Sequence, residues 1–108
     1  MLRTEVQRKT HCTACPVARV ADVVGDPCSL LIVRDLLGGQ KRFCELEESL
    51  AGISSRTLTN KLKRLEQEKV LIRKELTRPS RVEYKLTAKG VALRSVVNAM
   101  RSYGERYL

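Results

Sequence analysis

The sequence predicts a domain of the α+β class that is mainly α-helical. Apolar residues recur at helical spacing over most of the chain, and two strand-like runs lie close together between residues 70 and 86. Hydrophobic residues make up 43% of the chain, which is enough for a core. At 108 residues the chain fits one domain. We expect an N-terminal arm over residues 1–15 and the folded domain over residues 16–108.

Two helices are expected at the start of the domain. In the first, residues 16–24, apolar side chains return every three or four positions, and Gly25 ends the helix. The second begins at Asp26 and Pro27, because an aspartate carboxylate caps free backbone amides and proline suits the first helical position. It runs to about Leu37 and is apolar on most sides, so we expect it to be the buried centre of the domain.

Two further helices, separated by a tight turn, are predicted next. The third helix fits residues 44–50, with two leucines pointing inward. The fourth begins after Ser54, whose hydroxyl suits a helix cap, and runs to about Lys69. Its expected buried stripe consists of Leu58, Leu62 and Leu65. Two short helices joined by a few residues that include glycine are typical of a helix-turn-helix.

A β-hairpin and a last helix complete the predicted order. Residues 70–76 and 81–86 read as strands, because the second run alternates apolar and polar side chains, and the tip between them is basic. Thr87 is expected to cap a helix that runs over about residues 87–108. The apolar stripe of that helix is longer than one small core requires, so we expect it to be a dimerisation element.

This order of elements is that of a winged helix-turn-helix protein with a two-stranded wing and a terminal dimerisation helix. The formal net charge is +9, and residues 54–81 alone carry nine basic and three acidic side chains, a net +6. A basic surface on the fourth helix and the wing favours a polyanionic partner. Since the major groove of a duplex admits one helix, we expect that partner to be double-stranded DNA.

The residues expected to contact DNA lie on the outward face of the fourth helix and at basic positions beside it. Near the start of the helix, Arg56 suits guanine and Asn60 suits adenine. The surrounding lysines and arginines suit phosphates, and the arginines at the wing tip suit the flanking minor groove. The predicted set is Lys41, Arg42, Ser54, Ser55, Arg56, Thr57, Thr59, Asn60, Lys63, Arg64, Arg78 and Arg81.

Three groups of residues carry a resemblance to a known family. The first is Cys15-Pro16-Val17-Ala18-Arg19, Asp22-Val23-Val24-Gly25 and Leu30-Leu31-Ile32-Val33-Arg34-Asp35-Leu36. The second is Lys41-Arg42-Phe43, Glu45-Leu46 and Gly52-Ile53-Ser54. The third is Thr57-Leu58-Thr59, Leu62, Leu65-Glu66, Val82-Glu83-Tyr84, Leu86-Thr87 and Gly90. As a set they resemble the HxlR family of bacterial winged-helix regulators, which is related to MarR. The resemblance implies a homodimer that controls transcription from a palindromic operator, with recognition helices about 34 Å apart.

The cysteines are the candidates for control. The resemblance implies that a cysteine near the start of the first helix senses electrophiles or oxidants, and Cys15 holds that position. A helix N-terminus stabilises a thiolate, which favours reaction at Cys15 and at Cys44, expected at the capping position of the third helix. Cys12 offers a disulfide partner, whereas Cys28 is expected in the hydrophobic interior. A reduced structural thiol at the helix start is the alternative to sensing.

Other classes of function fit the residues less well. The only histidine, His11, forms with Cys12 and Cys15 three ligands in five residues, which do not complete a zinc site. We therefore expect no metal and no cofactor, and a metal- or ligand-responsive regulator is the minority alternative. A Gly-rich phosphate loop is missing, so we expect no enzyme. A non-specific architectural DNA binder is another alternative. No apolar run spans a bilayer and no signal peptide is evident, so a cytoplasmic location is expected.

Overall fold

The computed structural model describes residues 15–76 and 81–108. The first elements are helix α2 (Pro16–Val24), helix α3 (Pro27–Leu36), strand β1 (Lys41–Arg42), helix α4 (Phe43–Ser49) and helix α5 (Ser55–Gln67). They are followed by strand β2 (Leu71–Glu75), strand β3 (Val82–Leu86), helix α6 (Ala88–Val91) and helix α7 (Arg94–Tyr107). The predicted α+β class with mainly helical content is confirmed.

Helix α3 forms the centre of the domain, as expected. Asp26 caps it, because its Oδ2 accepts a hydrogen bond from the Ser29 backbone N–H at 3.0 Å. Ile32 and Val33 are fully buried, and α3 packs against α2, α4, α5, α7 and β3. The helix ends at Leu36, one residue earlier than predicted, before the Gly38-Gly39 turn.

Helices α4 and α5 form the predicted helix-turn-helix. Leu46 of α4 and Leu50 at its C-cap are buried. Helix α5 buries its stripe of Leu58, Leu62 and Leu65. The turn between the helices contains Gly52 with φ 94°, a backbone conformation that glycine adopts without the cost a side chain would add.

The C-terminus of α5 is closed by a lysine in the left-handed region. Lys69 has φ 62°, and its N–H donates to the carbonyl of Glu66 at 3.0 Å. The next N–H, of Val70, donates to the carbonyl of Leu65 at 2.9 Å. This pair of bonds is the Schellman arrangement, in which glycine is the usual residue at the left-handed position.

The sheet has three antiparallel strands in the order β1-β3-β2, so β3 lies in the middle. Leu71 pairs with Leu86 in the hairpin, and on the other side of β3 Lys41 pairs with Tyr84. The sequence predicted only the two hairpin strands, because the two residues of β1 are too few to show an alternating pattern.

The C-terminal segment forms two helices rather than the single one expected. Thr87 does act as a cap, but of the short α6, where its Oγ1 accepts from the Gly90 N–H at 3.1 Å. A turn at Ala92 and Leu93 then separates α6 from α7. Gly90 lies so close to the carbonyl of Val70 that an added Cβ would collide with it. Helix α6 thus packs against β3 and against Val70, the residue before β2, and α7 begins after the turn.

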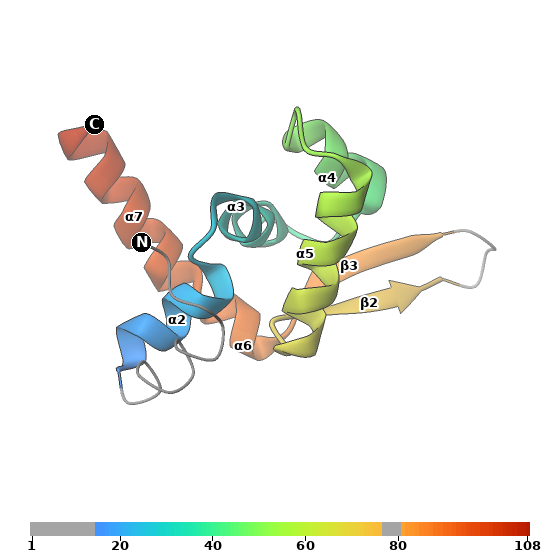
Figure 1. Ribbon diagram of the computed structural model, residues 1–108, viewed down its shortest axis with the longest axis horizontal. Coiled ribbons are helices and arrows are strands. Elements are labelled where there is room, and N and C mark those ends of the chain that lie inside the picture. The colour runs from blue at the N-terminus through green and yellow to red at the C-terminus, as the bar shows by residue number, and fades with distance from the viewer. Residues whose placement is uncertain (1–14, 77–80) are drawn as a thin grey trace.

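The wing and α7 extend from opposite sides of the domain (Figure 1). Helix α3 lies between them, and α2 lies on the same side as α7. Among residues 15–76 and 81–108, no helix has the length and apolar character needed to cross a membrane.

Candidate nucleic-acid interface

The start of α5 is fixed by hydrogen bonds that its own sequence supplies. The Ser54 hydroxyl accepts from the Thr57 backbone N–H at 3.0 Å and donates to Thr57 Oγ1 at 2.9 Å. Ser55 donates from its hydroxyl to Glu47 Oε2 at 2.6 Å, which ties α5 to α4. Three residues of the predicted DNA-contacting set therefore also hold the two helices of the motif in place.

The outward face of α5 carries the side chains that are available to a partner. Arg56, Asn60 and Lys63 are exposed, and Thr59 beside them is half-buried. Within the described parts of the chain, none of the three exposed side chains has a hydrogen bond or an ion pair. Since the opposite face of α5 is the buried leucine stripe, this face points away from the core. It combines one guanidinium, one amide and one ammonium group, which is the chemistry that reads base edges and phosphates.

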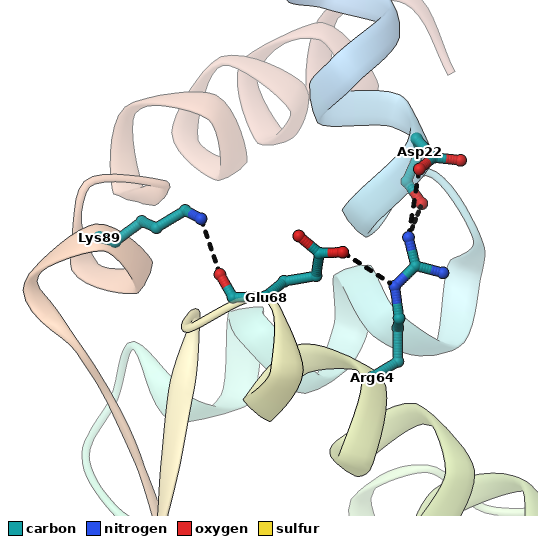
Figure 2. Close-up of polar contacts among 4 residues, drawn as sticks. All are labelled: Asp22, Arg64, Glu68 and Lys89. Carbon is teal, nitrogen blue, oxygen red and sulfur yellow. Dashed lines mark hydrogen bonds and ion pairs between the residues drawn. The ribbon is translucent and has the colours of Figure 1, made fainter. Parts of the chain in front are cut away.

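Arg64 does not point outward with the others, so the predicted direction of its side chain is wrong. Its guanidinium is turned toward Asp22 on α2 and Glu68 on α5 (Figure 2). Arg64 lies seven residues, almost two full turns, after Thr57 and so on the same flank of the helix. That flank faces α2 and the start of α3, where two carboxylates lie within reach of its basic residues.

Beside Arg64, Lys61 is held in the same way. Its Nζ lies 3.4 Å from Oδ2 of Asp26, the cap of α3. Burial raises the pKa of Asp26, but the Ser29 N–H and the Lys61 ammonium outweigh it and hold that pKa below its ordinary value. A polar cavity of about 300 Å³ opens between these groups and is lined by Asp22, Val23, Asp26, Ser29, Thr57, Asn60, Lys61 and Arg64.

The basic pair in β1 lies at the start of α4. Arg42 is exposed and Lys41 half-buried, and the Arg42 backbone N–H donates to Glu45 Oε1 at 2.9 Å. This hydrogen bond, together with the nearby cations, holds the pKa of Glu45 below its ordinary value. The Arg42 guanidinium lies 3.6 Å from the same carboxylate oxygen. Its charge is therefore partly compensated in the free protein.

The wing contributes further basic side chains. Arg81 is exposed at the start of β3, whereas Arg78 lies outside the described residues. Lys74 and Lys85 are also exposed and, by the strand register, lie on the same face of the hairpin. These two lysines were not among the predicted contacts, although the alternation of side chains along the strands was the signal that places them together.

Three cysteines lie in the described residues, and all are free thiols. Cys15 is exposed at the N-cap of α2, as predicted, and Cys28 is half-buried on α3. The predicted capping position of Cys44 is wrong. Arg42 is the cap, because pairing of β1 with β3 brings the start of α4 to Phe43, and Cys44 is an exposed residue of the first turn. Cys12 and His11 lie outside the described residues.

A helix-turn-helix, an exposed basic and polar face on its second helix, and an adjoining basic wing define a winged helix-turn-helix protein of the DNA-binding class. The model of the HxlR-like helix-turn-helix family matches residues 23–108. The chain belongs to this family and is a transcriptional regulator rather than an enzyme.

Relatives and solved structures agree with that assignment. An uncharacterised HTH-type transcriptional regulator, sll1512 of Synechocystis, is 38% identical over 87% of this chain and 70% of its own length. The crystal structure of PA1607, described as a putative transcription factor, is 42% identical with a TM-score of 0.82, over 89% of this chain and 67% of that one. Reduced YodB of Bacillus subtilis, a transcriptional regulator, is 36% identical with a TM-score of 0.75, over 86% of this chain and 93% of that one.

Proposed function

We propose that this regulator binds a palindromic operator in double-stranded DNA as a homodimer, with α5 in the major groove and the wing against the flanking backbone. The exposed side chains of Arg56, Asn60 and Lys63 on the outward face of α5 carry this proposal. Arg56 and Asn60 read base edges, while Lys63 binds a phosphate. Thr59 adds a hydroxyl beside them.

Basic residues around α5 anchor the duplex and set its register. Arg42 lies at the start of α4, and Arg81, Lys74 and Lys85 lie on the wing. Phosphate contacts fix orientation without reading sequence, so these residues supply affinity that falls with salt. Lys41, whose side chain is half-buried, has the same role toward the DNA phosphates. Arg64 is left out of this set because its guanidinium is occupied.

The exposed apolar stripe of α7 supports the homodimer. Val97 is buried, but Met100 is 49% exposed, and Tyr103 and Tyr107 are each 61% exposed. The last three recur at intervals of three and four residues, which places them along one side of a helix. Helix α2, which lies on the same side of the domain as α7 (Figure 1), carries Val17, and this residue is 77% exposed. A second copy of the chain, packed through α7 and α2, removes both apolar surfaces from water.

The thiol of Cys15 is the proposed sensor of electrophiles and oxidants. It is exposed at the N-cap of α2, where reagents in solution can reach its sulfur. Structures of YodB are similar to this chain in the quinone-bound form, at 34% identity, and after treatment with diamide, at 36% identity. With a quinone, the sulfur forms a bond to a ring carbon and the thiol proton ends on the reduced ring. With diamide, two thiols lose two electrons and two protons to the reagent and form a disulfide.

Selection of duplexes from a random pool tests the DNA-binding proposal. The protein is expected to enrich one inverted repeat whose half-site centres lie about one helical turn, or a multiple of it, apart. The enriched duplex is then titrated beside a scrambled duplex of equal length. Enrichment of a single unrepeated site would contradict the dimer, and equal affinity for the scrambled duplex would favour an architectural binder instead.

A further inference from the structure

The C-terminal half of α5 is held from one side by a bridge to α2. Arg64 donates from Nη2 to Oδ2 of Asp22 at 3.1 Å and to the backbone carbonyl of the same residue at 3.4 Å. From Nε it donates to Oε1 of Glu68 at 3.3 Å, one turn further along α5. Asp22 precedes Arg64 by 42 residues, so this is a contact between distant segments. Figure 2 shows the guanidinium between the two carboxylates.

The same end of α5 is held from the other side by α6. Lys89 donates from Nζ to the backbone carbonyl of Glu68 at 2.7 Å, where the helix dipole favours a cation. Thr87 donates its hydroxyl to the carbonyl of Lys69 at 2.6 Å. Glu68 is therefore the common point of the two sets of contacts, with its side chain toward Arg64 and its carbonyl toward Lys89 (Figure 2).

The two helices that hold α5 are those next to the proposed control and dimer surfaces. Helix α2 carries Cys15 at its first turn and Val17 on its exposed side. Helix α6 leads directly into α7. A polar cavity of about 300 Å³ lies between α2, the start of α3 and α5, so the side chains there do not fill the space between the helices. Both α2 and α5 pack against α3, and across the gap between them the ion pair of Arg64 with Asp22 supplies a direct contact.

The bridge contributes little to stability. The side chain of Arg64 is 34% exposed and that of Asp22 21% exposed, and ion pairs near solvent are worth little because water screens them. The buried leucine stripe on the opposite face holds α5 in the core without the bridge. A guanidinium with two carboxylates and a carbonyl as acceptors does, however, fix an angle, because its donors lie in one plane.

We propose that Arg64 is a positioning residue, which sets the orientation of the recognition helix relative to α2 through Asp22 and does not contact DNA. This inference rests on the proposed role of α5 as the recognition helix. A change in α2 is passed to α5 through this contact, so the bridge determines DNA affinity from outside the interface.

Three variants test the bridge with two matched controls. Arg64→Gln and Asp22→Asn each remove one partner, and the double variant removes both. Lys63→Gln removes the neighbouring charge that is proposed to bind a phosphate, and Glu105→Gln removes an exposed acidic group from α7. Thermal melting confirms that each is folded. Binding is measured over a series of KCl concentrations with the duplex that the wild-type protein enriches from a random pool, and with a scrambled duplex.

The expected results differ from those of a direct contact in the salt slope of Arg64→Gln and in the sign of the effect of Asp22→Asn. Arg64→Gln weakens binding about two- to thirtyfold, the range typical of residues that couple parts of a protein without touching the ligand. Its salt slope equals that of the wild type, whereas Lys63→Gln lowers the slope by about one per subunit. Asp22→Asn weakens binding as well, although it makes the protein more basic, while Glu105→Gln does not weaken it. The double variant loses no more than the stronger single one, because the pair acts as a unit.

Two results overturn the inference. One is a salt slope for Arg64→Gln that falls as it does for Lys63→Gln, which would make Arg64 a phosphate contact. The other is tighter or unchanged binding by Asp22→Asn, which carries the test alone if Arg64→Gln does not fold. If the wild-type protein enriches no duplex, sequence reading fails as a separate matter, and the slopes on the scrambled duplex still decide the role of Arg64.

Discussion

Replacing Tyr103 with serine should convert the proposed dimer to a monomer. Its side chain is 61% exposed on α7, in the stripe that also holds Met100 and Tyr107. An aromatic side chain offers about 200 Å² of surface, so roughly 120 Å² of it is available for a partner to cover. At about 25 cal/mol per Å² this is ~3 kcal/mol per subunit, or up to ~6 kcal/mol for both subunits of a symmetric dimer.

A loss of that size is readily measured. Each 1.4 kcal/mol is tenfold in the dissociation constant, so the dimer of Tyr103→Ser should weaken by as much as about four orders of magnitude. Sedimentation velocity over a range of protein concentrations gives the constant. Glu105→Gln lies on the same helix off the apolar stripe and should dimerise as the wild type does. If Tyr103→Ser dimerises equally well, the reasoning from the stripe fails, and another surface must form the dimer.

Four further outcomes follow from individual side chains. Arg56→Ala should weaken binding to the enriched duplex by about 1–3 kcal/mol and relax base preference, and an unchanged affinity and preference in competition titrations would remove Arg56 from the reading face. Cys15→Ser should fold and bind DNA, yet keep its affinity after diamide or quinone treatment; release equal to that of the wild type would transfer sensing to Cys44 or Cys12. Gly90→Ala should lower the free energy of unfolding by about 1–3 kcal/mol in urea titrations, because the added Cβ meets the carbonyl of Val70; an unchanged urea midpoint would show that α6 shifts freely. Asp26→Asn should destabilise the protein by about 0.2–1 kcal/mol near pH 7, because asparagine keeps the helix cap and only the ion pair with Lys61 is lost. The lowered pKa of Asp26 means that this contribution is complete above its unfolded pKa and is lost as the pH falls through the lower folded one, so melting curves of the two proteins should converge in acid; a constant difference would contradict this.

Local chemistry made much of the fold predictable. Asp26, Ser54 and Thr87 each cap a helix because their side chains accept from the backbone amide three residues ahead, and the sequence alone displays these capping residue types. The leucine spacing of α5 likewise fixed which face is buried. Gly90 was different, because its close approach to the carbonyl of Val70 is visible only in the folded chain. Neither glycine nor proline marks the break itself at Ala92 and Leu93.

What the sequence could not show depends on residues that are distant along the chain. Strand β1 exists because Lys41 and Arg42 pair with β3, more than 40 positions later. That pairing also moved the start of α4 and displaced Cys44 from the capping position. For Arg64, helical periodicity showed that the residue lies off the buried stripe, but it did not show that its side chain reaches Asp22 on α2. Periodicity predicts the face of the helix on which a residue lies and not the charged group with which its side chain pairs.

The lysine at the end of α5 has a consequence for the choice of binding sites. A glycine at position 69 could adopt this backbone conformation and many others at positive φ, whereas a lysine at φ 62° has few other conformations there. Lys69 therefore restricts the backbone conformation of the connection from α5 to β2. In the proposed complex, the distance along the duplex between the bases contacted by α5 and the backbone contacted by the wing depends on this one backbone angle.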